Sequence, residues 1–278
     1  MPRDIRVPWL WGTRRVERKR AVIKAAGRDL AVQWLRPEDG AAGPTLVFLH
    51  EGLGSIALWR DFPTRLCTAL GLPGLVYDRW GHGQSEPLDR PRDLRYLHDE
   101  AERFLPEVLA EGGVTRPVLI GHSDGGTIAL LYAARFPEVP AAVVTEAAHV
   151  FVEDLTVAGI RAAGRAFAET DLPTKLARYH GDKTATLFRA WHDRWLAPDF
   201  RAWNIEAEIA AVTCPTLVLQ GEADQYGTPA QVEAIARGVT GPAETELLPG
   251  IGHAPHQEAP DRVLALIAEF LRRRLAPG

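Results

Sequence analysis

Cysteine and long apolar runs are both scarce in this chain of 278 residues. The two cysteines, Cys67 and Cys214, are too few for a disulfide framework and lack the CxxC spacing of a metal site. A reduced, cytoplasmic compartment is therefore expected. No stretch reaches the roughly 18 consecutive apolar residues of a membrane-spanning helix, and no continuous apolar segment follows the basic N-terminal residues, as a secretion signal requires. The sequence therefore predicts no membrane partner.

Positive charge is in the minority outside the N-terminal region. Residues 1–28 hold nine Lys or Arg and two acidic residues, whereas the remainder has 23 basic and 34 acidic residues. We interpret residues 1–20 as a basic arm. Such an arm could touch nucleic acid or anionic lipid, but packing of Trp9 and Trp11 on the acidic body or on a partner subunit is the favoured interpretation. No nucleic-acid partner is expected, and a homo-oligomer is compatible with this arm.

Short apolar runs alternate with amphipathic segments along most of the chain. Two β-like runs at 21–26 and 30–36, joined by residues 27–29, predict a hairpin. Further strands are expected at 45–49, 74–77, 118–120, 141–144, 216–219 and 244–248, and helices at 59–70, 96–110, 126–135, 229–237 and 260–275. Unbroken apolar strands need cover on both faces, so the pattern predicts an α/β fold whose mostly parallel central sheet has helices on both faces.

The alternation stops between residues 149 and 210, where no convincing strand occurs. This stretch is helical in character and contains Trp191, Trp195 and Trp203. We interpret it as a helical cap inserted into a core formed by residues 21–148 and 211–278, because it directly follows a strand whose C-terminal end should face a pocket. The alternative is a set of helices beside the sheet with no role in a site.

The segment Gly121-His122-Ser123-Asp124-Gly125 runs from an apolar strand straight into an Ala/Leu-rich helix. A sharp strand-to-helix turn strains its central residue, and bulky neighbours would clash at the two glycines. Such a turn exposes the serine hydroxyl at a helix N-terminus, where amide donors favour a developing anion. The context predicts a nucleophile elbow with Ser123 as the nucleophile.

A serine needs a base, and the base needs a carboxylate to fix its tautomer. His253, in a glycine-flanked loop after the last strand, is favoured as the base over nearby His256. Asp224 ends a tight turn after another strand and is the favoured acid, with Glu146 as its rival and Glu222 as a poorer candidate. His50, His122 and His149 are expected to fix loop shapes through hydrogen bonds.

Two backbone amides should form an oxyanion hole. One belongs to Asp124, the residue after the nucleophile. The other should come from the glycine-containing turn after the first parallel strand, where Gly52 is preferred and Leu53 follows if the register differs by one. Leu53, Asp124, Trp191 and Trp195 are the candidate substrate-binding residues. A phosphate cradle is disfavoured because the GxGxxG and Walker spacings are absent.

Four motifs in this order resemble the α/β-hydrolase superfamily over roughly residues 20–275: the loop 50–54, the stretch 78–85, the elbow 121–125, and Gly221-x-x-Asp224 with Gly252-His253. The resemblance implies the α/β-hydrolase fold and a Ser-Asp-His triad. Serine at the nucleophile position argues against the dehalogenase and epoxide-hydrolase branches. Ala254 stands where the meta-cleavage C–C hydrolases usually carry Trp. The Ser-Asp-Gly-Gly elbow is similar to that of some amino-ester hydrolases.

The expected reaction is two-step hydrolysis of a carboxylic ester of a small or medium substrate through an acyl-enzyme, without metal or organic cofactor. One alternative is C–C bond hydrolysis, which needs an arginine of the cap to bind a substrate carboxylate; the available arginines are Arg161, Arg165, Arg178, Arg189, Arg194 and Arg201. Another is a non-catalytic ligand-binding protein on the same scaffold. The Asp124 side chain has two interpretations: a structural partner such as Arg79, or a substrate ammonium group bound with the help of Glu51.

Overall fold

The computed structural model describes residues 15–40 and 43–276. The first 14 residues of the expected arm, Trp9 and Trp11 among them, lie outside the described residues. The strands are β1 (Val16–Ala25), β2 (Arg28–Pro37), β3 (Thr45–Leu49), β4 (Gly74–Tyr77), β5 (Pro117–His122), β6 (Ala142–Glu146), β7 (Thr216–Gly221) and β8 (Ala243–Leu248). The α-helices are α1 (Phe62–Leu70), α2 (Tyr96–Asp99), α3 (Leu105–Glu111), α4 (Asp124–Arg135), α5 (Asp154–Glu169), α6 (Leu172–His180), α7 (Thr184–Leu196), α8 (Pro229–Gly238), α9 (Pro255–Glu258) and α10 (Pro260–Leu275).

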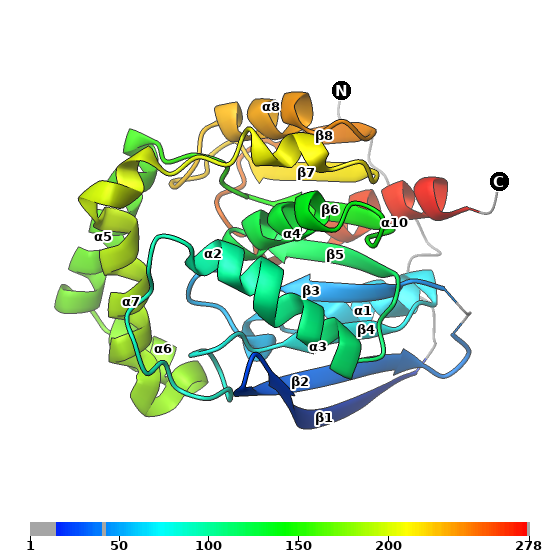
Figure 1. The fold of residues 1–278 in the computed structure, drawn as a ribbon, viewed down its shortest axis with the longest axis horizontal. Helices are drawn as coiled ribbons and strands as arrows, with labels where there is room; N and C mark the ends of the chain where they lie inside the picture. Colours follow the sequence, from blue (N-terminus) through cyan, green and yellow to red (C-terminus); the bar gives the residue numbers. More distant parts are fainter. Residues whose placement is uncertain (1–14, 41–42, 277–278) are drawn as a thin grey trace.

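All eight strands form one sheet in the order β1-β2-β4-β3-β5-β6-β7-β8 (Figure 1). The pairs β1–β2 and β2–β4 are antiparallel, and every other pair is parallel. The mostly parallel sheet predicted from the apolar runs is therefore confirmed. The expected helix at 96–110 is α2 and α3 joined by a π-helical segment at Glu100–Phe104.

The N-terminal hairpin is longer than predicted. Residues 16–20, which we expected in the basic arm, form the first half of β1. The turn consists of Ala26 and Gly27, with φ angles of 48° and 77°, in place of the expected residues 27–29. Positive φ at two consecutive turn residues is what a tight hairpin needs to match the twist of its strands. The charged side chains of β1 suit an edge strand, because they disfavour pairing with another chain.

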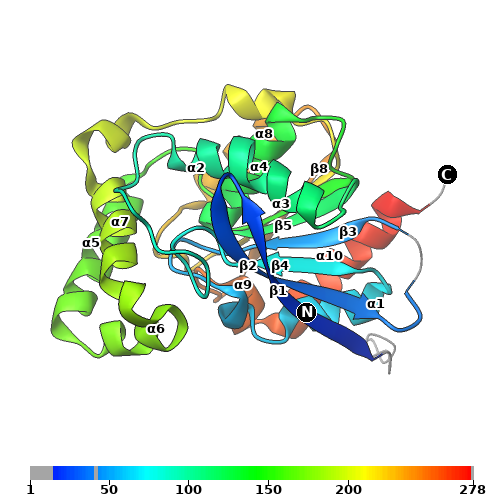
Figure 2. The ribbon, with the colours of Figure 1, turned by 60° about the horizontal axis from the view of Figure 1, so that its bottom comes forward.

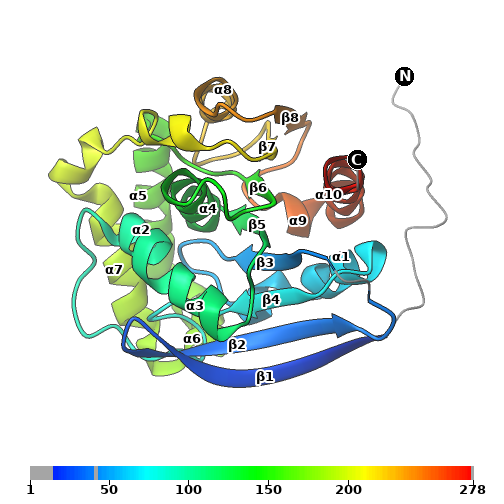
Figure 3. The same cartoon turned by 45° about the vertical axis from the view of Figure 1, so that its right-hand side comes forward.

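Helices cover both faces of the sheet (Figure 3). Alternate residues of β3 point to opposite sides: Leu46 and Phe48 belong to the apolar cluster with α1 and α10, whereas Val47 and Leu49 belong to the cluster with α3, α4 and α8. This alternation buries the sheet on both sides and explains why its strands read as unbroken apolar runs.

The helices α5, α6 and α7 lie at the end of the sheet toward which the parallel strands point (Figures 1 and 2). Lys183, just before α7, donates hydrogen bonds to the backbone oxygens of His82, Gly83 and Ser85. His180 accepts from Gly83 N at 3.0 Å through Nδ1 and donates to Leu53 O at 2.9 Å through Nε2. These contacts fasten the α6–α7 corner to loops that follow β3 and β4. Within the described part of the chain, no helix is long and apolar enough to cross a membrane.

Candidate active site

Ser123 occupies a strained turn between β5 and α4, with φ 52° and ψ −118°. A Cβ added at Gly121 would lie 2.2 Å from Gly125 O, and one added at Gly125 would lie 1.9 Å from Leu49 O. Only glycine fits at either position, since any side chain would overlap backbone atoms. The two glycines therefore permit the sharp turn, and backbone strain of this kind often accompanies function.

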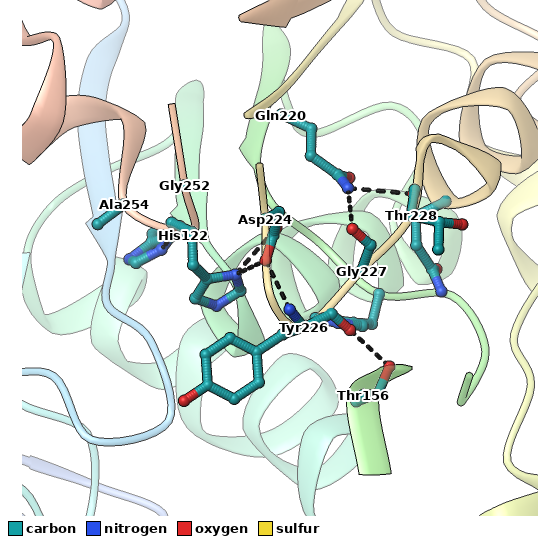
Figure 4. A network of polar contacts seen from close by, with 12 residues as sticks. His122, Thr156, Gln220, Asp224, Tyr226, Gly227, Thr228, Gly252 and Ala254 are labelled. Atoms are coloured by element: carbon teal, nitrogen blue, oxygen red, sulfur yellow. Dashed lines mark hydrogen bonds and ion pairs between the residues drawn. The ribbon is translucent and has the colours of Figure 1, made fainter. Parts of the chain in front are cut away.

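His253 and Asp224 lie together although they come from different loops. His253 Nδ1 is 2.9 Å from Asp224 Oδ1 and 3.0 Å from Oδ2, so this hydrogen bond leaves Nε2 as the free ring nitrogen. Asp224 Oδ1 also accepts from Tyr226 N at 2.8 Å, and Figure 4 shows both contacts of Asp224 beside Gln220 and Thr156. Burial favours a raised pKa for Asp224, but the hydrogen bond and charge of His253, the Tyr226 N–H and the charge of His149 together outweigh it and hold the pKa below its usual range.

Burial has the opposite effect on His253, the candidate base. It lowers the pKa of His253, and the hydrogen bond to Asp224 opposes this effect without cancelling it. His253 is therefore largely neutral at neutral pH, as a general base must be. A neutral imidazole that donates from Nδ1 presents the lone pair of Nε2 to an incoming proton.

The rival residues have other partners. Glu146 accepts from both the backbone N and Nδ1 of His256, at 2.9 and 3.0 Å, so neither residue is joined to the His253–Asp224 pair. Glu222 is exposed. The loop histidines behave as expected: His50 Nε2 accepts from Arg79 N at 3.0 Å, and His149 donates to Tyr226 O at 3.0 Å.

A carboxylate that the sequence analysis missed holds the His253 loop. Glu258 accepts hydrogen bonds from the backbone N of Gly252 at 2.7 Å and of Ala254 at 3.1 Å. These two amides flank His253, so Glu258 fixes the loop on both sides of the imidazole. The residue sits five positions beyond His253 in a short helix, and no pattern in the sequence marks it.

The two amides expected in the oxyanion hole are available. Neither Gly52 N nor Asp124 N donates a hydrogen bond to any residue the structure describes, and both residues line one cavity with Ser123. A hydrogen bond fixes the backbone next to Gly52, because Arg79 Nη2 donates to Glu51 O at 2.8 Å. The N–H groups of Gly52 and Asp124 are left for a ligand, which is the requirement for stabilising a forming oxyanion.

The Asp124 side chain is buried against cations of the protein itself. Its Oδ2 lies 3.5 Å from Arg79 Nη2, 3.8 Å from Arg92 Nη1 and 3.1 Å from Tyr96 Oη, which donates to it. The structural partner Arg79 was one of the two expected solutions, whereas Arg92 and Tyr96 were not anticipated. Two guanidinium groups already balance the carboxylate, so the geometry does not favour Asp124 as the binder of a substrate ammonium group.

The cavity at Ser123 has a volume of about 330 Å³. Leu53, Trp191 and Trp195 line it, as expected, together with Ile160 of α5 and Leu176 of α6. A Cβ at Gly52 would lie 2.3 Å from Trp191 Nε1, which shows how closely this indole packs on the loop. Trp195 Nε1 donates to Tyr96 Oη at 2.8 Å. Trp203 lies outside the cavity wall, stacked on Phe200.

The described cavity wall contains the carboxylates Glu51, Asp124 and Glu258 and the imidazoles of His122, His149 and His253, but no lysine or arginine. None of the six arginines considered for a substrate carboxylate belongs to the described wall. A more open groove of about 520 Å³ beside Trp203 and α8 contains none of the candidate catalytic residues. Among residues 15–40 and 43–276, no three His, Cys, Asp or Glu side chains are grouped so as to hold a metal ion.

Comparison with known proteins places the fold. The chain is 26% identical over 263 residues to 2-succinyl-6-hydroxy-2,4-cyclohexadiene-1-carboxylate synthase of Enterobacter sp. (strain 638), covering 84% of this chain and 93% of that protein. It is 28% identical over 275 residues to 2-hydroxymuconate semialdehyde hydrolase of Pseudomonas sp. (strain CF600), covering 88% and 93%. The solved structure of 2-hydroxy-6-oxo-6-phenylhexa-2,4-dienoate hydrolase from Rhodococcus sp. strain RHA1 superimposes with a TM-score of 0.77 at 17% identity, covering 93% of this chain and 100% of that one.

The family model described as the alpha/beta hydrolase family matches residues 46–266, well over half of the chain. This range runs from the second residue of β3 into the first half of α10, with the elbow, the His253–Asp224 pair and the helices α5, α6 and α7. The fold predicted from the four motifs is therefore confirmed, and the chain belongs to the alpha/beta hydrolase family.

Proposed function

We propose that the protein is a serine hydrolase that cleaves carboxylic esters. The preferred substrates are small or medium-sized esters that carry no charge. The observation that carries the proposal is the 2.9 Å contact between His253 Nδ1 and Asp224 in the same cavity as Ser123. This arrangement supplies a nucleophile, a largely neutral base and an ionised acid at one point.

In the proposed reaction, the Ser123 hydroxyl attacks the ester carbonyl while His253 Nε2 takes its proton. The amides of Gly52 and Asp124 stabilise the resulting oxyanion. His253 then protonates the leaving alcohol, and an acyl-enzyme remains on Ser123. Water, activated by His253, attacks this ester in the second step and releases the acid. Asp224 stays ionised throughout and stabilises the charged imidazole.

The preference for uncharged substrates follows from the cavity wall. Its apolar part consists of residues such as Leu53, Ile160 and Trp191, which stabilise an acyl chain by burying it. The carboxylates of Glu258 and Asp124 are engaged by backbone amides and by guanidinium groups. A substrate carboxylate would enter next to these acids without a lysine or arginine in the described wall, and the cation of His122 already faces Glu51, so burying the added charge costs free energy.

C–C bond hydrolysis is the second candidate, because one of the relatives is named as a semialdehyde hydrolase and the solved structure as a dienoate hydrolase. The absence of arginine from the described cavity wall and Ala254 after the base speak for the ester. A non-catalytic binding protein on this scaffold would not need a strained serine beside a His–Asp pair.

We further propose that residues 149–210 act as a cap on a core formed by residues 21–148 and 211–278. The cavity wall includes five residues of this segment: Thr156, Ile160, Leu176, Trp191 and Trp195.

Cys67 and Cys214 are free and buried, which supports the expectation of a reducing, cytoplasmic compartment.

The test combines a fluorophosphonate probe with a substrate panel of p-nitrophenyl esters of graded length, their ω-carboxylate analogues and a C–C substrate. We expect labelling at Ser123, turnover of neutral esters, and kcat/KM values for the carboxylate analogues lower by about tenfold or more. Ser123→Ala should remove labelling and lower kcat by about three or more orders of magnitude. Faster turnover of the C–C substrate than of any ester would favour the second candidate, and an unlabelled wild type would leave only a binding protein.

A further inference from the structure

His122, the residue before the nucleophile, contacts the base loop directly. Its Nε2 lies 2.7 Å from the backbone oxygen of His253. A carbonyl oxygen only accepts, so Nε2 carries a hydrogen and donates it. His122 is 2% exposed, and its position is fixed by β5, which pairs His122 with Glu146 of β6. A buried side chain on the central sheet therefore holds the backbone of the loop that carries His253.

The other nitrogen of His122 faces a carboxylate. Nδ1 lies 3.4 Å from Glu51 Oε2, so both ring nitrogens face oxygen acceptors. The contact at Nδ1 is an ion pair rather than a hydrogen bond, and it favours the protonated ring, which has a hydrogen on each nitrogen. Burial works against the charge, but Glu51, the charge of Glu146 and the His253 carbonyl together outweigh it and raise the pKa of His122. The same pair holds the pKa of Glu51 well below its usual range, although burial opposes this.

We propose that Glu51 and His122 form a positioning pair for the catalytic base: Glu51 aligns the His122 ring, and His122 fixes the backbone of His253. The inference rests on the proposed function, since it needs His253 to act as the base. The pair also places a cation beside the base, because the two imidazole rings are 5.2 Å apart. A cation at this distance favours the neutral form of His253, which is the form that accepts the proton of Ser123.

Other titratable groups surround these rings. His256, 5.0 Å from the His122 ring, is paired with Glu146. His253 itself faces Asp224, Tyr226 and, at 6.1 Å, His149. None of these residues reaches the His253 carbonyl, so the hydrogen bond from His122 is a separate support for the loop.

The test compares pH profiles of kcat/KM for a neutral ester. His122→Gln retains an N–H donor but loses the charge, so the acid limb should move to higher pH by about one unit. His122→Phe loses the donor as well, and its kcat should fall by about tenfold or more at all pH values, with KM changing little. Both variants are first titrated with the fluorophosphonate probe, so that only folded, reactive sites are counted.

His98→Gln is the matched control, because His98 also faces a carboxylate, Glu208, at 3.2 Å, but lies outside the cavity wall. Its pH profile should superimpose on that of the wild type. If the His122→Gln profile also superimposes on the wild type while Ser123→Ala is inactive, the positioning pair is overturned and the proposed function stands. If Ser123→Ala keeps its activity, the proposed function fails first. A loss of thermal stability without a shifted profile would assign His122 a purely structural role.

Discussion

The carboxylate of Glu146 binds His256 through two hydrogen bonds, one from the backbone N at 2.9 Å and one from Nδ1 at 3.0 Å. Glu146 is 0% exposed and His256 is 3% exposed, so water does not compete for these bonds. Glu146 is the last residue of β6, which pairs with β5, the strand that leads to Ser123. By its position it was a candidate for the carboxylate that orients His253. Its engagement with His256 leaves Asp224 as the carboxylate that contacts His253.

Replacing each of the two acids, Asp224 and Glu146, by its amide distinguishes their roles. Asp224→Asn should keep the shape of the site but favour the wrong histidine tautomer, which lowers kcat by about 10⁴-fold. Glu146→Gln should lower kcat far less, and its main effect should be a lower midpoint of urea unfolding, because a buried hydrogen-bonded carboxylate is replaced. Steady-state kinetics and urea titration of both variants check this. Reversed penalties on kcat would identify Glu146 as the acid.

Asp124→Asn tests the buried charges behind the oxyanion hole. The substitution removes one of the two carboxylates that interact with Arg79 and Arg92, the other being Glu100, and breaking a buried ion pair costs about 3–5 kcal/mol of unfolding free energy. The wild type should not prefer amino-acid esters over their des-amino analogues, because the Asp124 carboxylate is already engaged. Glu86→Gln, which weakens a partly exposed contact with Arg28, is the control and should change stability far less. A tenfold or greater preference for amino-acid esters, lost in Asp124→Asn, would contradict this assignment.

The two cavity tryptophans should respond differently. Trp191→Ala should extend the accepted acyl chain, because it removes a cavity wall whose indole nitrogen has no hydrogen-bond partner among the described residues. Trp195→Ala should mainly lower stability, since it also removes the donor to Tyr96 and leaves a buried hydroxyl unpaired on that side. Ester-length profiles and melting temperatures of both variants decide this. A collapse of the melting temperature in Trp191→Ala with an unchanged ester profile would place that residue in the core.

The Glu51–His122 pair should make stability depend on pH. The lowered pKa of Glu51 adds stability above its unfolded-state pKa, and this is lost as the pH falls through the folded-state pKa. The raised pKa of His122 adds stability below its unfolded-state pKa, and this is lost as the pH rises through the folded-state pKa. Glu51→Gln should therefore destabilise the protein more at pH 6 than at pH 9. Urea unfolding at both pH values measures it, and an equal loss at both would exclude a charged pair.

The parts of the fold and of the candidate site that depend on local sequence pattern could be predicted from the sequence. Unbroken apolar runs indicated the strands, and glycines on either side of Ser123 indicated the turn, because these features have the same physical cause in any chain. The partners of Asp124 could not be predicted in full. Arg92 reaches it from a loop and Tyr96 from a helix, and no sequence spacing connects either residue to the elbow. The sequence also contained six arginines in the inserted segment, but which face of a helix meets the cavity depends on packing. Ala26 entered the turn unexpectedly, because alanine rarely adopts positive φ.

The contacts of Lys183 and His180 with the core determine how the inserted helices come apart from it. Lys183 satisfies three backbone oxygens of one loop, and His180 bridges that loop to Leu53. Removing residues 149–210 would leave these groups and the apolar cavity wall facing water. The inserted helices and the sheet should consequently unfold in one cooperative transition, with slow amide exchange in α7 and β5 alike. A shortened chain without the helices is thus no minimal form of this protein.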